Sequence, residues 1–459
     1  MKPKKTHRKV RHGAALIIAM VFLVLFSTLA VSLVSLCDTN VQIAGNQHKV
    51  GLARSSAHSG LETCRYWLES EFIFMSGNTQ PAGRFACLAD KMSDEGAPVD
   101  LTYDEGEVVA VSMALTTFDS AAGQAFTAVL QPTADLDILQ LDVTGTGLGL
   151  ERKIRVQYKF GTRAHSVFDY GVATKGPLSL SGNIELSGYN ISVESDVYIE
   201  SLNQNEALSI IGNSQIAGDV KIVNPDGYAD LQGGKAAIGG ETVPEAYDHV
   251  EAGVPPTEFP LPMPNYFSHY VQGDIDMNDT VHTNVRIPPN TNPTFSGGEE
   301  FRGVLFIDVP NVVSFAGHVT ITGIIVGNGS HTDNSATNRI DFQGTVDSYP
   351  VTDLPDTADF HDLRNETGTF LMSPGFAVSF GGDFETLNGA IAANGVDFYG
   401  NAGGVINGSV VNYSDAPMTF SGNSDLVFNR TGITEVPAGF GPEIIMHYIP
   451  QSYEEVFDI

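Results

Sequence analysis

The sequence predicts a mixed fold: a long N-terminal transmembrane helix, a small α+β region, and then an all-β solenoid of the right-handed parallel β-helix type. Three observations predict it. An apolar run without charges occupies Ala14–Leu36, β-rich runs follow between Val99 and Phe160, and a glycine-bounded phrase recurs after Phe168. The expected parts are a basic leader (1–13), a spine helix (14–75), a small β-sheet region (76–165), a β-helix (166–432) and a C-terminal cap or tail (433–459).

The N-terminal segment has the features of a single membrane span. No residue of Ala14–Leu36 is ionisable, and at about 1.5 Å per helical residue this length crosses a hydrocarbon core of roughly 30 Å. A cleaved secretory signal peptide is the competing interpretation, but its apolar region is usually only about 7–15 residues long. The basic residues before the span predict a cytoplasmic N-terminus and an exported C-terminal bulk; they are Lys2, Lys4, Lys5, Arg8, Lys9 and Arg11.

The helix is expected to continue beyond the membrane. Asp38–Phe74 has apolar residues at mostly helical spacings and contains no proline, and Ser76-Gly77-Asn78 is a plausible stop. In an oxidising exported compartment Cys64 and Cys87 are candidates for a disulfide, and two free thiols are the alternative.

The region from Asn78 to Phe160 is predicted to form an antiparallel sheet. Its last two β-rich runs, Asp137–Val143 and Lys153–Phe160, flank Thr144-Gly145-Thr146-Gly147 and are expected to form a hairpin with its turn there. The earlier β-rich runs are Val99–Tyr103, Glu107–Met113 and Ala125–Leu130.

A glycine-bounded phrase recurs at Gly182–Gly188, Gly212–Gly218 and Gly317–Gly323. Each copy is a short strand between turn glycines and cannot bury its own apolar side chains, so successive copies must stack to make a core. This pattern favours a parallel β-helix over a β-sandwich, which would not need the recurring turn. A proline-rich insertion is expected at 241–293, because proline lacks the donor that a strand ladder needs, and an acidic loop is expected at 330–366.

The charge of the chain limits its partners. The 459 residues carry a formal net charge of −30 at pH 7, which argues against a nucleic-acid ligand and against adhesion to anionic lipid, because both need clustered Lys or Arg. Asp274, Asp276 and Asn278 resemble the opening of a calcium-binding loop, but the glycine at position six and the glutamate at position twelve are missing.

A second acidic set, Asp356, Asp359 and Asp362 with His361, has helical spacing. It is either a solvated capping turn or part of a carboxylate site of the kind that polysaccharide lyases and hydrolases use. The basic residues of the predicted solenoid are scattered singly, so no lyase-like Arg/Lys pair is evident; examples are Lys175, Arg302, Arg364 and Arg430. We therefore expect no enzyme, no cofactor and no metal centre.

The N-terminal region resembles a known family. Gly13, where the basic leader meets the apolar run, resembles the processing site of type IV prepilins and type II secretion pseudopilins. The start Gly13-Ala14-Ala15-Leu16, the phrase Val41–Gln47 (VQIAGNQ) and the stretch Gly51–Glu62 are similar to PilX-type pilus-assembly proteins. The resemblance covers about the first 70 residues and implies cleavage after Gly13 by a prepilin peptidase, so that the mature chain starts at Ala14. Ile18 stands where most major pilins have a glutamate, as in the K-type minor pseudopilin.

The resemblance implies a minor pilin or pseudopilin-like assembly component of a type IV pilus or type II secretion-like system, with a priming, tip or adhesive role. Its implied partners are the prepilin peptidase, other pilin or pseudopilin subunits, an inner-membrane assembly platform and membrane lipid. Its implied location is a single pass through the bacterial inner membrane, with the bulk in the periplasm or outside the cell, or in a pilus. The alternatives are a membrane-anchored surface β-helix that binds carbohydrate, and a β-helix polysaccharide lyase or hydrolase.

Overall fold

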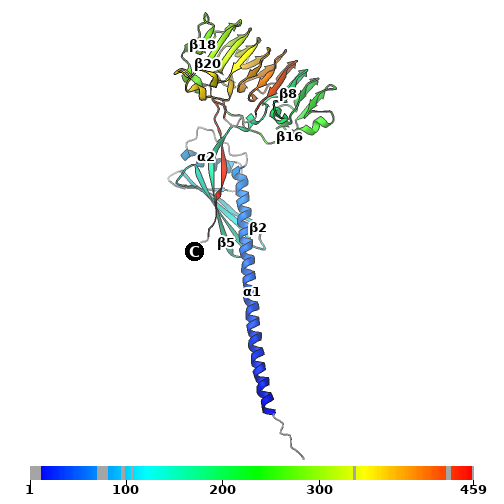
Figure 1. The fold of residues 1–459 in the computed structure, drawn as a ribbon, viewed down its shortest axis with the longest axis vertical. Helices are drawn as coiled ribbons and strands as arrows, with labels where there is room; N and C mark the ends of the chain where they lie inside the picture. Colours follow the sequence, from blue (N-terminus) through cyan, green and yellow to red (C-terminus); the bar gives the residue numbers. More distant parts are fainter. Residues whose placement is uncertain are drawn as a thin grey trace, which may run out of the picture. The chain divides into compact units, whose positions relative to one another are not determined.

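The computed structural model describes residues 12–69, 81–94, 99–104, 107–333, 337–430 and 436–456. The chain divides into two compact units (Figure 1), of which the second comprises Thr162–Ile444 and the first takes in most of the residues before and after it. The predicted leader Met1–Arg11 and the predicted helix stop Ser76-Gly77-Asn78 lie outside the described residues.

The first unit is built on one long helix, α1 (His12–Glu69), of 58 residues. Its residues are exposed from Leu16 to His48, and its C-terminal part is packed through buried side chains such as Ala53, Ala57 and Leu61. Figure 1 shows strands of the sheet beside this C-terminal part. The prediction of a helix that continues beyond the apolar run is therefore confirmed.

A six-stranded sheet packs on α1, in the order β1-β2-β3-β4-β5-β34, and β1 to β5 are antiparallel neighbours. The predicted hairpin is present as β4 and β5, but its turn lies at Leu148-Gly149, and Thr144–Gly147 belongs to β4. The bounds of the first five strands are β1 (Val99–Asp104), β2 (Glu107–Asp119), β3 (Gln124–Pro132), β4 (Ile138–Gly147) and β5 (Leu150–Arg163).

Two glycines of β4 bring the helix and the strand into backbone contact. A Cβ atom at Gly145 would lie 2.1 Å from the backbone nitrogen of Ala57, and one at Gly147 would lie 2.7 Å from the backbone nitrogen of Ala53. No side chain larger than hydrogen fits at either position without moving the helix. The alternation of threonine and glycine in this stretch therefore reflects the close approach of α1 rather than a turn.

Two elements of the first unit were not predicted. Helix α2 (Pro81–Asp94) buries Phe85, Leu88 and Met92. Strand β34 (Glu443–Val456) lies next to β5 as the last strand of the sheet, so the prediction of a cap or tail over 433–459 is wrong for Glu443–Val456. Before this strand, Val436, Ala438 and Phe440 do pack on the second unit. Pro450 is tolerated within β34 because an edge strand needs only one row of backbone partners.

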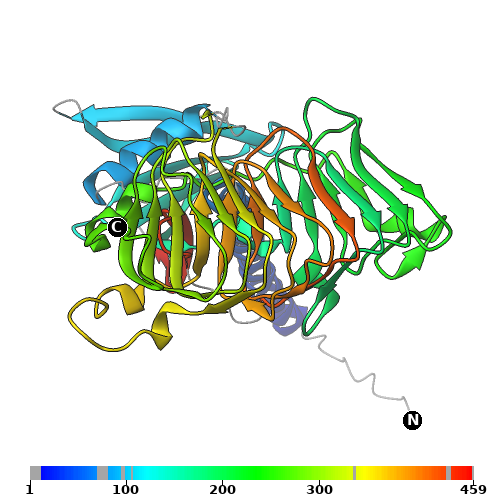
Figure 2. The same ribbon diagram turned by 90° about the horizontal axis from the view of Figure 1, so that it is seen from above.

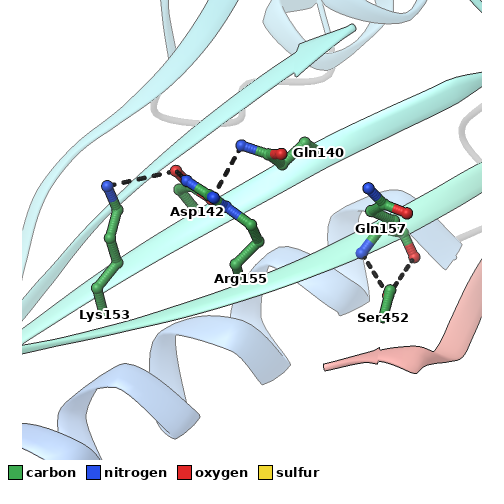
Figure 3. Close-up of polar contacts among 6 residues, drawn as sticks. All are labelled: Gln140, Asp142, Lys153, Arg155, Gln157 and Ser452. Atoms are coloured by element: carbon green, nitrogen blue, oxygen red, sulfur yellow. Dashed lines mark hydrogen bonds and ion pairs between the residues drawn. The ribbon is translucent and has the colours of Figure 1, made fainter. Parts of the chain in front are cut away.

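Ser452 links β34 to β5. Its Oγ accepts a hydrogen bond of 2.7 Å from the backbone N–H of Gln157, as Figure 3 shows. The pairing joins segments far apart in the chain, so the first unit contains residues from both ends of the sequence.

The second unit contains three sheets of mostly parallel strands. The nine-stranded sheet runs β13 (Tyr228–Gln232), β10 (Glu206–Gly212), β7 (Leu178–Gly182), β32 (Met418–Gly422), β29 (Val396–Phe398), β26 (Ala377–Phe380), β23 (Arg339–Phe342), β21 (Val312–Phe315) and β19 (Thr294–Phe295). The seven-stranded sheet runs β15 (Glu241–Thr242), β14 (Ala237–Ile238), β11 (Gln215–Ile216), β8 (Glu185–Gly188), β33 (Asp425–Phe428), β30 (Gly404–Ile406) and β27 (Thr386–Leu387).

The twelve-stranded sheet runs β16 (Val250–Ala252), β12 (Val220–Ile222), β9 (Val197–Ile199), β6 (Val172–Thr174), β31 (Val410–Asn412), β28 (Ala390–Ala393), β25 (Thr369–Ser373), β22 (Val319–Gly327), β20 (Glu299–Ile307), β18 (Val281–Ile287) and β17 (Gly273–Asp274), with β24 (Val346–Tyr349) paired to β22. Short 3-10 helices connect the strands: η1 (Ser166–Asp169), η2 (Ser192–Ser195), η3 (Glu245–His249), η4 (Pro264–Tyr270), η5 (Val351–Asp353) and η6 (Leu363–Asn365).

The chain passes through the three sheets in turn, one coil at a time, and the coils form a stack. The order of the coils along the chain differs from their order in the stack. The first coil of the unit, formed by β6, β7 and β8, pairs on one side with the next coil and on the other side with the last coil, formed by β31, β32 and β33. Figure 2 shows the orange coils of the C-terminal part between the yellow-green and the green coils. The first coil therefore lies inside the stack, and the last coil completes the stack by pairing with it.

The interior is held by rows of matching side chains. A row of phenylalanine rings has centroids 4.8–5.2 Å apart from one coil to the next, and Leu180 and Ile210 continue it beyond the last ring. Stacked rings at this spacing attract one another and fix the register of neighbouring coils. The rings belong to Phe295, Phe315, Phe342, Phe380, Phe398 and Phe420.

The proline-rich segment connects the two ends of the stack. Residues 253–272 join β16 to β17, which are the two outermost strands of the twelve-stranded sheet. Eleven strands lie side by side from β16 to β17 in this sheet, so at about 4.8 Å between neighbours the segment must cross roughly 48 Å. With η4 at about 2.0 Å per residue and the other residues extended at about 3.1 Å each, this segment reaches roughly 54 Å, whereas an α-helix of the same length would reach only roughly 30 Å. Proline therefore suits a segment that must cross the sheet without joining it.

Contacts along this segment confirm the crossing. The hydroxyl of Tyr413 donates a hydrogen bond of 2.6 Å to the carbonyl oxygen of Pro260, and the Tyr198 hydroxyl accepts one of 2.7 Å from the backbone N–H of Thr257. Phe267 is fully buried in an apolar cluster with Val304 and other residues on the outer side of the same sheet. Two predicted ranges are too wide. The predicted insertion 241–293 includes the strands β15 to β18, and the predicted loop 330–366 includes the strands β23 and β24.

Candidate assembly helix and candidate ligand sites

The N-terminal part of α1 is an apolar surface that nothing covers within the described chain. Large apolar side chains are exposed around the helix, including Leu16, Phe22, Leu29 and Val41. Among the described residues this is the one helix long and apolar enough to cross a membrane, and none of its most apolar window is buried. Such a surface is stable in lipid or against other apolar helices but not in water.

Three hydroxyl groups of this part form hydrogen bonds within the helix itself. Ser27 Oγ donates to the carbonyl oxygen of Val24 and Thr28 Oγ1 to that of Leu25, both at 2.9 Å, and Thr39 Oγ1 donates to the carbonyl oxygen of Ser35 at 2.8 Å. In lipid an unsatisfied hydroxyl would be costly. The hydroxyls therefore do not prevent this helix from entering a bilayer.

The expected processing site lies in the first turn of α1. The backbone of Gly13 and Ala14 is helical, and Ile18, at the position where major pilins have a glutamate, is 55 % exposed. The cleavage itself stays a prediction.

The face of the six-stranded sheet opposite α1 carries a compact charge cluster (Figure 3). Asp142 accepts hydrogen bonds of 2.7 and 2.8 Å from Arg155 and lies 3.3 Å from Lys153 Nζ. Burial alone would raise the pKa of Asp142, but the hydrogen bonds from Arg155 and the charges of Arg155 and Lys153 lower it below its usual value. One carboxylate pairs with two cations here, so each charge has a partner within the cluster, and we interpret it as a structural feature of the sheet.

The cysteines do not form the predicted disulfide. Cys64 is a free buried thiol in the structure, and its Sγ lies 3.2 Å from the Sδ of Met113 in the core of the first unit. Cys37 is exposed on the apolar part of α1. For Cys64 the structure therefore agrees with the alternative prediction, a free thiol.

The candidate calcium-loop residues form a local turn. Asp276 accepts hydrogen bonds from the backbone N–H and the side-chain amide of Asn278 at 2.9 and 2.8 Å, and these bonds lower its pKa. Asp274 is exposed on β17. Among the residues that the structure describes, no group of three or more His, Cys, Asp and Glu could hold a metal ion. The turn therefore accounts for this acidic sequence.

The second acidic set also has a structural explanation. Asp356 pairs with Nδ1 of His361 at 2.8 Å, which raises the pKa of His361, and Asp359 accepts a hydrogen bond of 2.9 Å from Gln272. The apolar side chains around them pack on the twelve-stranded sheet, so the segment covers that sheet with its charges outward; these side chains are Val351, Leu354, Phe360 and Leu363.

One basic residue has a role that the sequence did not reveal. Arg430, after the last coil, donates to the carbonyl oxygens of Glu194 (2.8 Å), Val193 (2.6 Å) and Phe168 (3.3 Å), all close to the first coil. Burial lowers its pKa, while nearby carboxylates oppose that shift. Its partners are more than 200 residues earlier, so no local pattern could have identified it. Among the other basic candidates, Arg302 pairs with the half-buried Glu300 two positions away and with no other carboxylate of the described residues.

Comparisons with known proteins add little to this account. No protein-family model matches the chain, and no curated protein sequence matches it either. Among solved structures it is similar to the competence-associated pilin ComZ from Thermus thermophilus, with 13 % sequence identity over 89 % of this chain and 98 % of that one and a TM-score of 0.30. A similarity this low does not bear on function, so the functional argument rests on the sequence and the geometry.

Proposed function

We propose that this chain is a minor pilin or pseudopilin-like subunit, cut after Gly13, anchored in the membrane by α1 and then moved into a filament. The observation that carries the proposal is the division of α1. One continuous helix has an apolar part exposed through Leu36 and a C-terminal part that packs on an antiparallel sheet. The sequence resemblance to pilins, from Gly13 onward, falls on this same helix and supports the proposal.

The exposed part of α1 favours helix packing over a simple anchor. About 20 apolar residues are enough to span a bilayer, yet the helix stays exposed and unbroken to His48. Gly45 lies on this part and Gly51 shortly after it, and a Cβ built at either position would meet no described atom within 4 Å beyond the adjacent helix backbone. Small residues at such positions let a second helix approach closely. A helix that only tethers the chain needs neither feature.

The large unit is the part that such a subunit would display. We interpret it as a right-handed parallel β-helix, supported by in-register parallel pairs such as Leu180 with Ile210 and Phe342 with Phe380. The role of such a domain at the tip or side of a filament would be adhesion or priming of assembly. Ile18 supports a tip or priming position, because a subunit without the glutamate cannot pair with the terminal amine of a neighbour.

The partners of this role are the prepilin peptidase, other pilin or pseudopilin subunits, the inner-membrane assembly platform and lipid before assembly. The bulk of the chain is then in the periplasm or outside the cell. The second candidate is a surface protein that stays in the membrane and binds carbohydrate there. The exposure of α1 beyond Leu36 favours the filament subunit over this candidate.

The test is release of the chain with sheared filaments. We expect the wild-type chain and the control variant Tyr228→Ala, which changes an exposed residue of β13, in the sheared fraction, at far lower copy number than the major subunit. The variant Gly13→Leu should stay in the membrane fraction with its leader attached. A wild-type chain found only in membranes, or release of Gly13→Leu at the wild-type level, would contradict the proposal.

A further inference from the structure

A hollow of about 350 Å³ opens on the second unit between β24 and β27. It is lined by Asp347, Ser348 and Tyr349 of β24, by Thr386 of β27 with Glu385 and Asn388 on either side of that strand, and by Asn407. Ligand pockets in proteins measure roughly 300–1,000 Å³. The hollow is thus large enough for a small ligand and too small for a folded partner.

The hollow exists because the strand ladder opens at this point. Strand β27 is the last strand of the seven-stranded sheet, and β24 pairs with β22 in the twelve-stranded sheet instead. The two strands still meet at the bridge between Val346 and Phe384. They meet again where Asn388 donates to the carbonyl oxygen of Ser348 at 2.7 Å. Contacts at both ends hold the hollow open without requiring a ligand.

The amide groups in the hollow are fixed before any ligand arrives. Asn407 Nδ2 donates to Asn388 Oδ1 at 2.8 Å, and Asn429 Nδ2 donates to Asn407 Oδ1 at 3.0 Å. Together with the bond from Asn388 to Ser348, these contacts use one N–H and one lone pair of each lining amide. A side-chain amide has two of each, so Asn388 and Asn407 each keep a donor and an acceptor for a ligand. Fixed groups lose little freedom on binding.

The charges and the ring define the kind of ligand. Asp347 and Glu385 bring carboxylates to the hollow, and no Lys or Arg lines it. Nε2 of His318 lies 2.7 Å from Asp347 Oδ2 and holds this carboxylate in place. Anions are therefore repelled, whereas ligand hydroxyl groups can donate to the carboxylates. The Tyr349 side chain, in a residue that is 46 % exposed, adds an apolar ring surface.

We propose that this hollow binds a neutral sugar. A pyranose has several hydroxyl groups for the amides and carboxylates, and one face of C–H groups that can lie against the Tyr349 ring. The lining side chains supply both surfaces within one small concavity. The proposal depends only on the second unit and holds whether or not the chain enters a filament.

The experiment is saturation-transfer difference NMR on the detergent-solubilised full chain. The probes are the methyl glycosides of glucose, galactose, mannose and N-acetylglucosamine, with glucuronic acid as the anionic comparison. We expect saturation transfer to at least one neutral sugar, with a Kd on the order of 1 mM for a ligand of this size. Glucuronic acid should bind at least threefold more weakly than that sugar.

Three tyrosine variants then locate the site. Tyr349→Ala should weaken binding threefold or more, whereas Tyr349→Phe, which keeps the ring, should stay within threefold of the wild type. The control Tyr228→Ala removes a tyrosine of similar exposure, 51 %, from β13 outside the hollow and should have no effect. The proposal is overturned if none of the neutral sugars binds, if glucuronic acid binds equally well, or if Tyr349→Ala changes the Kd by less than threefold.

Discussion

Replacing Arg430 tests whether contact between the last coil and the first coil is a main source of stability in the second unit. The guanidinium donates three hydrogen bonds to backbone carbonyls of Phe168, Val193 and Glu194. These residues flank the first coil, and Arg430 follows β33 of the last coil. The variant Arg430→Met keeps much of the aliphatic stem and removes all three bonds.

The expected loss follows from these bonds. A hydrogen bond to a charged group contributes about 1.5–3 kcal/mol, but the guanidinium also loses hydration on burial, which is why its pKa is lowered. The net loss for Arg430→Met should therefore be about 2–4 kcal/mol, less than the sum of three bonds. Arg430→Lys keeps the charge but not the planar arrangement of donors, so it should fall between the wild type and Arg430→Met.

The assay is unfolding in guanidinium chloride, followed by circular dichroism on the full chain in detergent. The matched control is Arg302→Met, because Arg302 is exposed and pairs with Glu300. It should change the free energy of unfolding by no more than about 0.5 kcal/mol. If Arg430→Met costs no more than Arg302→Met, the contact between the last and first coils does not contribute as we infer.

Three further outcomes are expected. Phe398→Ala removes a fully buried ring stacked at 5.0 and 5.1 Å on its two neighbours and should cost about 3–5 kcal/mol in the same unfolding assay; Phe398→Leu should cost less, and equal losses would count against the stacked row. Gly145→Ala should destabilise the first unit by more than about 3 kcal/mol, because the new Cβ would lie 2.1 Å from the Ala57 nitrogen. By contrast, Gly51→Ala, with open space around it, should be neutral or stabilising by up to about 1 kcal/mol, and similar effects of the two variants would refute the close approach. Burial lowers the pKa of His165 from 6.5 to about 4. The neutral imidazole therefore costs the folded state nothing above pH 6.5, and as the pH falls from 6.5 towards 4 the free energy of unfolding should decrease by roughly 3 kcal/mol at most. His165→Gln should remove this part of the pH dependence, and an unchanged pH profile of the unfolding free energy would contradict the assignment.

The elements that the sequence predicted well are those with a local signal. The apolar run and the spacing after it predicted α1, and alternating β-forming residues predicted the hairpin of β4 and β5. The phrases at Gly182 and Gly212 predicted turns that the structure places in register, with φ angles of +116° and +90°. Each of these signals lies within a few residues of the element that it describes.

The elements that were missed depend on distant partners. Strand β34 pairs with β5, which comes from a distant part of the chain, whereas Pro437, Pro442 and Pro450 in and before the strand suggested a tail. The turn predicted at Thr144–Gly147 was wrong because the glycines serve the approach of α1 from a different part of the chain. The order of the coils depends on pairing between the first and last coils, which similar glycine-bounded phrases cannot specify.

The candidate sites show the same division. The apolar helix surface and Gly13 were evident from the sequence. The acidic sets around Asp276 and Asp356 were evident as well, although their local hydrogen bonds to Asn278 and His361 explain them without a ligand. The hollow near Tyr349 was missed, because its lining comes from three separate segments of the chain.

The most direct test of the proposed function is the N-terminal sequence of the mature chain isolated from cells. If the chain is processed like a pilin and α1 is its assembly helix, the first residue is Ala14. A chain that still begins at Met1, or one that begins beyond Leu36 after loss of the apolar helix, would contradict the account.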